Sequence, residues 1–310
     1  MPNNKFRLVT RSDFDGLVCA VLLKDLDLID DILFVHPKDM QDGKIDITEN
    51  DITTNLPYVA GCHIAFDHHL SETVRNSSDI KNHIIDPKAP SAARVVYDSY
   101  GGAEKLPNIS VEMMDAADKG DAAQFSKDEI LNPTDWELMN FIMDARTGLG
   151  RFREFKISNY QLMMKLIDAC KDQSIEEILQ MEDVAERVAL YNEHNEKAKE
   201  QISQCATVHK NLVVLDLTQE ETIYATNRFV IYAMYPDCNI SIHKMWGLKK
   251  QNVVYAVGKS ITNRSSNTNV GELCLKYNGG GHLNAGTCQV ETSKSEAVLS
   301  ELIDKITSDG

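Results

Sequence analysis

The pattern of apolar and polar positions divides the chain into an alternating first part, a helical middle and a mixed last part. In the first hundred residues, apolar runs of strand length alternate with stretches of helix length. Such alternation is typical of a parallel sheet with helices on its faces. The predicted strands cover residues 6–10, 32–36, 51–55, 62–66 and 83–86, and the predicted helices cover 17–25 and 91–100.

From residue 110 the apolar positions recur at helical spacing, and after residue 207 strand and helix patterns mix again. The middle part predicts helices over residues 111–117, 135–144, 158–171 and 174–204. The last part predicts strands over 211–217, 238–246 and 252–259, the last two as a hairpin, and helices over 227–235, 269–277 and 295–306.

These patterns predict an α/β protein of two domains. A parallel-sheet domain covers residues 1–192, and a smaller α/β domain covers residues 208–310. Residues 193–207 are predicted to form a helical linker, with a helix packed on the first domain as the alternative. The length of 310 residues agrees with two domains, because single cores usually split beyond about 250–300 residues.

Composition narrows the possible partners. The net charge of −15 disfavours long nucleic acids, which need basic grooves, but it allows a short anionic substrate held by metal ions and a few cations. Seven cysteines without a CxxC pair indicate reduced thiols in a cytoplasmic protein. The N-terminal MPNNKFRLVT does not resemble a signal peptide, and no apolar run is long enough to span a membrane.

Candidate chemistry follows two of the predicted strands. Asp67, His68 and His69 come directly after the strand over 62–66, where open α/β sheets carry their active sites. Asp13 and Asp15 stand between the first strand and its helix, and Gly16 allows the tight turn there. Carboxylates and imidazoles that converge in this way can bind a metal ion or transfer protons. Capping of the following helix is the alternative role of Asp15.

Three motifs stand in a fixed order: DxDG at 13–16, DHH at 67–69 and GGGH at 279–282. Together they resemble the DHH phosphoesterase superfamily, in its subgroup with a C-terminal DHHA1 domain, over nearly the whole chain. The superfamily includes RecJ-like exonucleases, nanoRNA and pAp phosphatases, cyclic dinucleotide phosphodiesterases, exopolyphosphatases and family II pyrophosphatases. The resemblance implies a parallel α/β DHH domain, a smaller α/β DHHA1 domain, and an active site in the cleft between them.

The resemblance also implies roles for single residues. Asp13, Asp15 and His68 match metal ligands, and Asp67 and His69 match groups that orient or act on the leaving group. An acid about fifty residues later is a further ligand: Asp118 fits best, with Asp121 as the runner-up. We therefore predict Asp15, Asp67 and His69 as catalytic residues. The ions expected in such a site are Mn²⁺ or Mg²⁺.

The second domain is expected to hold the substrate. The loop of Gly279, Gly280, Gly281 and His282 offers backbone N–H groups and an imidazole to an anion. An Arg-Ser pair usually precedes this loop in the family, and Arg264-Ser265 stands in that place. A guanidinium binds a phosphate through two hydrogen bonds.

Two positions depart from the family pattern. Val9 stands where a metal-binding histidine is common, and Asn55 stands where the third strand normally ends in an aspartate. The uncharged amide oxygen of Asn55 is the candidate metal ligand there, and Asp51 is the alternative if that strand ends earlier. We therefore expect one tight metal ion and a second that is weak, absent or recruited with the substrate. Arg11 or Lys119 is a candidate for the missing positive charge.

The resulting hypothesis is a metal-dependent, nucleotide-binding phosphoesterase acting on nanoRNA, a linear or cyclic dinucleotide, or a pAp-like nucleotide. An exopolyphosphatase or pyrophosphatase is the first alternative. A catalytically impaired nucleotide-binding regulatory module is the second, because of Val9 and Asn55. A homodimer is possible. Tyr255 and Trp246 are candidates for base stacking, although packing in the core is the favoured role for both.

Overall fold

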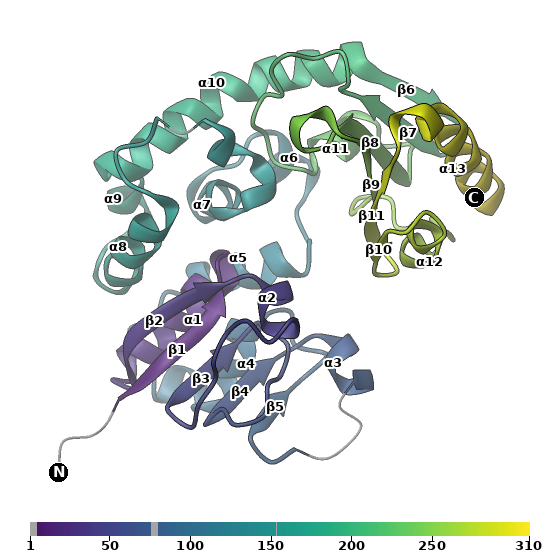
Figure 1. The fold of residues 1–310 in the computed structure, drawn as a ribbon. Helices are drawn as coiled ribbons and strands as arrows, with labels where there is room; N and C mark the ends of the chain where they lie inside the picture. Colours follow the sequence, from purple (N-terminus) through teal and green to yellow (C-terminus); the bar gives the residue numbers. More distant parts are fainter. Residues whose placement is uncertain (1–4, 76–79, 153) are drawn as a thin grey trace. The chain divides into compact units, whose positions relative to one another are not determined.

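The computed structural model describes residues 5–75, 80–152 and 154–310 (Figure 1). The chain forms two compact units. The first unit contains residues 1–124, 133–145 and 149–189, and the second contains residues 125–132, 146–148 and 190–310. The sequence-based boundaries at residues 192 and 208 stay predictions.

The first unit is built on a five-stranded sheet in the order β2-β1-β3-β4-β5. Every neighbouring pair of strands is parallel, which confirms the sheet type expected from the alternating pattern. Leu8 and Val9 in the middle of β1 are fully buried, so Val9 is a core residue. The strands are β1 (Phe6–Arg11), β2 (Ile29–Val35), β3 (Asp51–Thr54), β4 (Ile64–Asp67) and β5 (His83–Ile85).

The helices of the first unit follow the predicted spacing, with three differences, one of which is that α3 was not predicted. The predicted helix over 174–204 is broken at Met181, whose ψ of 132° is not helical. The helix predicted to end at residue 117 continues to Asp121. The helices are α1 (Phe14–Asp25), α2 (Pro37–Gln41), α3 (Leu70–Arg75), α4 (Ala92–Ser99), α5 (Val111–Asp121), α7 (Asp135–Met143), α8 (Asn159–Asp172), α9 (Ile175–Gln180) and the first part of α10 (Glu182–Cys205).

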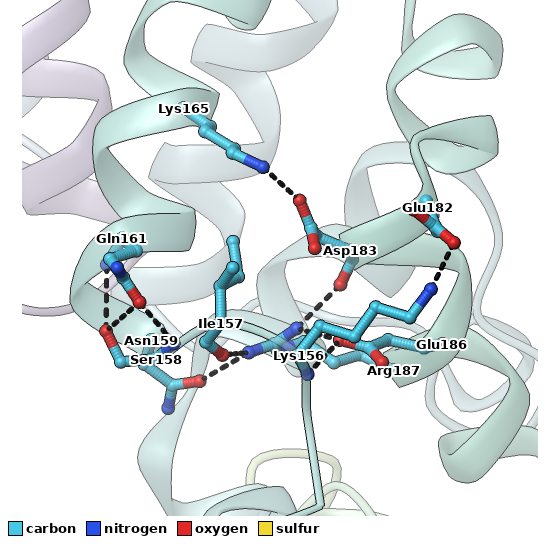
Figure 2. Close-up of polar contacts among 10 residues, drawn as sticks. All are labelled: Lys156, Ile157, Ser158, Asn159, Gln161, Lys165, Glu182, Asp183, Glu186 and Arg187. Atoms are coloured by element: carbon cyan, nitrogen blue, oxygen red, sulfur yellow. Dashed lines mark hydrogen bonds and ion pairs between the residues drawn. The ribbon is translucent and has the colours of Figure 1, made fainter.

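The buried side chain of Arg187 connects the start of α10 to the segment before α8 through hydrogen bonds (Figure 2). The guanidinium of Arg187 donates to the carbonyl oxygens of Asp183, at 2.7 Å, and Ile157, at 2.8 Å. It also lies 4.1 Å from the ring centre of Phe155. Lys165 adds an ion pair between α8 and Asp183. A buried guanidinium requires such partners because an unpaired one would lose its hydration without compensation.

The second unit contains a six-stranded sheet in the order β10-β11-β9-β8-β7-β6. The predicted hairpin of β8 and β9 is confirmed as an antiparallel pair, and β7 with β8 is the parallel pair of this sheet. Strand β6, at the end of α10, was not predicted. The strands are β6 (Ala206–His209), β7 (Leu212–Asp216), β8 (Ile240–Trp246), β9 (Val253–Lys259), β10 (Gly280–Gly281) and β11 (Ala285–Val290).

The core of the second unit lies between its sheet and helices. Tyr255 is fully buried and donates to the carbonyl of Ser295, while Trp246 donates from Nε1 to the carbonyl of Thr218. Tyr255 is part of the core and the partly buried Trp246 packs against it, as favoured from the sequence. The described parts of the chain contain no helix long and apolar enough to cross a membrane. The helices of this unit are α6 (Lys127–Leu131), α11 (Val230–Met234), α12 (Val270–Leu275) and α13 (Ser295–Asp309).

Short 3₁₀ helices complete both units. They are η1 (Gly102–Glu104), η2 (Ala145–Thr147), η3 (Leu149–Arg151), η4 (Leu248–Lys250) and η5 (Thr292–Lys294).

Candidate metal and phosphoester site

The turn between β1 and α1 holds two aspartates in different roles. Asp13 is the N-cap of α1 and accepts from the backbone N–H of Gly16 at 3.0 Å. Asp15 lies in the first turn of α1 and is only 3% exposed. Its carboxylate accepts from the backbone N–H groups of Ala92, at 3.0 Å, and Ala93, at 2.7 Å. Asp15 is therefore held by the start of α4, where helix N–H groups favour a negative charge.

Gly16 is required by the closeness of the turn. A Cβ atom at this position would lie 2.0 Å from the carbonyl oxygen of Arg11. Glycine therefore allows α1 to start directly against the end of β1, which brings Asp15 to the carboxyl edge of the sheet.

Three side chains converge at this edge. His68, which follows β4, has its Nε2 2.8 Å from Oδ2 of Asp121 and its Nδ1 3.2 Å from the carbonyl oxygen of Ala89. One ligand atom from each of Asp15, His68 and Asp121 lies within 4.8 Å of the others. Two carboxylates and one imidazole at this spacing can hold one divalent ion.

The structure brings Asp121, the runner-up, rather than the preferred Asp118 to His68, and which of the two acids is a ligand stays a prediction. Asp118 accepts from Oγ of Ser91 at 2.6 Å, and from Nε and Nη2 of Arg94 at 2.9 and 2.5 Å. It thus ties α5 to α4 and has its charge neutralised by a guanidinium. Asp121, one turn further along α5, is the acid that reaches His68.

The positively charged side chain of Arg11 lies beside Asp13. Nε of Arg11 lies 2.9 Å from Oδ2 of Asp13, and Nδ2 of Asn55 donates to Oδ1 of Asp13 at 3.2 Å. The buried Oδ1 of Asn55 has no hydrogen-bond partner in the described residues. Lys119 instead pairs with Glu137, at 2.5 Å. Of the two predicted cations, Arg11 is the one beside Asp13.

Asp51, the alternative to Asn55, lies away from Asp13 and has partners of its own. Asp51 is the first residue of β3, whereas Asn55 follows its last residue. The two residues therefore lie at opposite ends of this strand. The carboxylate of Asp51 accepts from Nε of Arg7 at 2.6 Å and from the backbone N–H of Thr48 at 2.7 Å. Asn55 itself has a φ of +54°, a left-handed conformation that asparagine tolerates better than most residues.

Asp67 orients His69. Its fully buried carboxylate has Oδ1 2.7 Å from Nδ1 of His69, and the same oxygen accepts from the backbone N–H of His68 at 2.9 Å. A carboxylate that accepts from Nδ1 selects the tautomer with a free Nε2 and raises the basicity of the ring. The His69 side chain is 38% exposed, so its ring is accessible from solvent.

Burial and neighbouring charges shift the pKa values of the groups in this cluster. Burial raises the pKa of Asp15 to about 7, and the charge of Asp121 adds to the rise. Burial lowers the pKa of His68, but its hydrogen bond and ion pair with Asp121 outweigh burial and raise the pKa to about 9. Burial also raises the pKa of Asp121, which the contact with His68 reverses to a net decrease. Likewise, burial lowers the pKa of His69, and the bond to Asp67 reverses this to an increase.

The predicted substrate-binding residues lie in the second unit, and all except the half-buried Gly279 are exposed. Gly280 and Gly281 form β10, and the backbone N–H of His282 donates to the carbonyl of Ala285 at 2.7 Å. A Cβ atom at Gly279 would lie 2.1 Å from the carbonyl oxygen of Thr287, which explains that glycine. Arg264 is exposed, and its Nε donates to the carbonyl of Ile261 at 3.2 Å.

Some supporting residues were missed in the sequence. Nδ2 of Asn239 donates to Oγ of Ser265 at 3.0 Å, and Nδ2 of Asn211 donates to Oδ1 of Asn239 at 2.9 Å. This amide chain holds the Arg264-Ser265 loop, and nothing in the local sequence indicates it. Ser91 is the N-cap of α4 and also contacts Asp118. A serine before an apolar helical run is a capping signal, so the role of Ser91 as N-cap could have been predicted from the sequence.

No protein-family model and no curated protein sequence matches the chain. Among solved structures, it is similar to PggH, a pGpG-specific phosphodiesterase from Vibrio cholerae, with 64% identity, a TM-score of 0.90, and coverage of 99% of this chain and 100% of that one. CDC45 from Entamoeba histolytica matches with 10% identity and a TM-score of 0.50, covering 98% of this chain and 95% of that one. RecJ with Mn²⁺ from Thermus thermophilus matches with 13% identity and a TM-score of 0.46, covering 98% and 52%.

High identity over the full length of a phosphodiesterase, together with the ordered DxDG, DHH and GGGH motifs, identifies the family. The chain belongs to the DHH phosphoesterase superfamily. It is a hydrolase that acts on phosphoester bonds. The likeness to CDC45 shows only that the fold is shared.

Proposed function

We propose that this protein is a metal-dependent phosphodiesterase that cleaves short linear dinucleotides, with pGpG as the preferred substrate. The observation that carries the proposal is the 64% identity to a pGpG-specific phosphodiesterase over essentially the whole of both chains. Enzymes this similar usually share a reaction, and the acidic net charge of −15 agrees with a short substrate better than with long nucleic acid.

The residues at the edge of the first sheet fit a divalent ion. The unpartnered oxygen of Asn55 and the raised pKa of Asp15 are both features that a bound cation would relieve. Asp15, His68 and Asp121 would hold the ion, and Asn55 and Asp13 stand beside them. A divalent ion in such a site lowers the pKa of a bound water and neutralises phosphoryl charge.

We further propose a single tight ion, because Asp13 is already paired with Arg11 and Val9 is buried in the core. Titration of the metal-free protein with Mn²⁺ by calorimetry should give one tight site, lost in Asp121→Asn. Two equally tight Mn²⁺ sites in the absence of substrate would contradict this proposal.

The chain's own groups divide the remaining work. His69, oriented by Asp67, would transfer a proton to the leaving oxygen from its Nε2. Arg264 and the Gly279–His282 loop would bind the substrate by its terminal phosphate. Arg11 would keep the charge of Asp13 balanced when an anionic substrate approaches.

The test is hydrolysis of pGpG by the purified protein with Mn²⁺, and separately with Mg²⁺. Asp15→Asn should remove activity, whereas Asp172→Asn, an exposed acid on α8, should leave it unchanged. Short RNA, cyclic dinucleotides, pAp, pyrophosphate and polyphosphate complete the substrate panel. Faster turnover of pyrophosphate or polyphosphate would favour the first alternative, and nucleotide binding without hydrolysis would favour a regulatory module.

We also propose a cytoplasmic location and a homodimer. All seven cysteines are free thiols, which supports a reducing compartment such as the cytoplasm. A homodimer is proposed from the frequency of two-fold oligomers among enzymes. Light scattering of the purified protein would decide the oligomeric state.

A further inference from the structure

Helix α12 lies beside β10 in the second unit (Figure 1). A pocket lies where the helix meets this strand and the GGGH loop. Its lining includes Gly280 and His282 from the loop, and Glu272 and Leu275 from α12. Gly271 allows the close approach of helix and loop, since a Cβ there would lie 2.8 Å from the carbonyl oxygen of Gly281. The pocket is therefore built by two segments in direct contact.

Gly280 leaves space that the protein itself does not use. A Cβ atom at Gly280 would meet no described heavy atom within 4 Å, and the backbone there is not left-handed. Neither packing nor conformation thus requires glycine at this position, although glycine weakens a strand. Free space of this kind, beside a pocket, is typical of a place where a ligand approaches the backbone closely.

The pocket has exposed apolar walls. Leu275 is 67% exposed and Leu283 is 58% exposed, and both line the pocket. Large apolar side chains at this level of exposure gain stability when a flat apolar surface covers them. A nucleobase offers such a surface on both of its faces.

Polar groups at the same pocket have a definite hydrogen-bonding character. Glu272 contributes a carboxylate, which only accepts hydrogen bonds when ionised. Asn269 caps α12 by accepting from the backbone N–H of Glu272 through Oδ1, at 3.3 Å. Its Nδ2 remains as a donor on the same side chain. The pocket thus combines an acceptor pair with a donor.

We propose that this pocket binds a guanine base, with Glu272 accepting from its N1–H and 2-amino group and Leu275 and Leu283 covering its faces. Nδ2 of Asn269 would donate to O6. The proposal rests on the proposed function, since it assigns the residue that selects guanine in a dinucleotide substrate.

The chemistry of the two purines explains why a carboxylate would select guanine. The edge of guanine presents two adjacent donors, which a carboxylate can accept together, whereas adenine presents the lone pair of N1 at the corresponding place. A carboxylate therefore binds guanine and repels adenine. Hypoxanthine keeps N1–H but lacks the 2-amino group, so it tests half of the contact.

The experiment compares binding of pGpG, pIpI and pApA by calorimetry, using full-length Asp15→Asn protein with Mn²⁺ so that the ligands stay intact. The expected preference for pGpG over pIpI is about 10-fold, as for a good bidentate contact to a base. Adding Glu272→Gln should reduce the preference to about 2-fold or less. The matched control Asp304→Asn, an exposed acid on α13, should keep it.

A second variant separates the base contact from a general loss of binding. Leu275→Ser should weaken pGpG and pIpI by the same factor and leave their ratio unchanged. The proposal is overturned if the protein binds no dinucleotide, if it does not distinguish pGpG from pIpI, or if Glu272→Gln keeps the full preference. The proposed function fails separately, when the wild-type protein with Mn²⁺ does not hydrolyse pGpG.

Discussion

The polar groups of the first unit's site are buried or partly buried and bonded to each other or to the backbone, whereas most of those in the second unit's predicted binding loops are exposed. Asp15 and Asp67 are 3% and 0% exposed and accept from named N–H groups. By contrast, Gly280, His282 and Arg264 are exposed. Under the proposed roles, the groups for chemistry are positioned before substrate binds, while the groups for recognition become ordered around it.

The origin of the difference lies in the elements that carry each set. The groups of the first unit sit where parallel strands end and helices begin, so backbone N–H groups are available to fix carboxylates. The groups of the second unit sit on the loops around α12 and β10, where side chains meet solvent. Prepositioned charges stabilise a transition state because they do not need to reorganise during the reaction.

Replacement of the two acids of α5 should give the largest effect. Asp121→Asn should lower kcat/KM for pGpG by more than about 100-fold, because loss of a metal ligand should exceed the typical effect of a supporting partner. Asp118→Asn should retain much more activity and mainly lower the melting temperature, since it weakens the contact with Arg94. If Asp118→Asn proves the more damaging in a folded protein, the assignment to Asp121 is wrong.

The buried Arg187 in the network of Figure 2 tests whether fixed polar groups in the first unit also support its stability. Arg187→Ala should destabilise this unit by about 1–3 kcal/mol for each carbonyl left unpaired. The carbonyl groups of Asp183 and Ile157 are the two that the guanidinium satisfies. Thermal unfolding measures the effect, and Lys165→Ala, which removes only a half-exposed ion pair, is the control. Equal melting temperatures for the two variants would argue against a role for Arg187 in stability.

In the second unit, Asn239→Ala should have a smaller effect on the reaction. It removes the hydrogen bond that holds Ser265, so KM for pGpG should rise by about 2- to 10-fold, the equivalent of one net hydrogen bond. The value of kcat should change little. Asn252→Ala, which removes an exposed hydrogen bond to Gln289 on β11, is the matched control. A fall in kcat instead would mean that the loop takes part in chemistry.

The smallest expected effect is a change in the pH dependence of stability, caused by His243. Burial lowers the pKa of His243 on β8 to about 4. Because the unfolded chain binds a proton near pH 6.5 and the folded chain does not, stability is complete above pH 6.5 and declines as the pH falls toward 4. At pH 6 the cost is about 1 kcal/mol or less. His243→Asn should show a smaller fall in melting temperature between pH 8 and 6 than the wild type does.

The fold was largely predictable because each parallel strand and helix leaves a local pattern. The five strands of the first sheet, the β8–β9 hairpin and most helices fall within a few residues of their predicted positions. The errors arose where local pattern does not decide the outcome. Apolar positions keep their helical spacing through Met181, so the break between α9 and α10 was not predicted. Strand β6, which pairs with β7, is a short segment of polar and apolar residues without a clear strand pattern.

The candidate site was predictable as a set of motifs but not as a geometry. Asp118 and Asp121 are three residues apart on one helix, so spacing from the DHH motif fits either acid. Which of the two acids faces His68 depends on how α5 is rotated against α4. In this packing Arg94 donates a hydrogen bond to Asp118. In the same way, Asp51 and Asn55 stand at the two ends of one strand, and only the register with β1 shows which end faces Asp13.

The sequence by itself determined the family, the α/β architecture and the chemical types of the groups at the first sheet's edge, because motif order and periodicity are local properties. The tertiary structure decided which acid joins Asp15 and His68, that Arg11 neutralises Asp13, and that Glu272 and two exposed leucines share a pocket. These are contacts between elements distant in the sequence. They depend on the packing of whole helices and strands, which no short segment encodes.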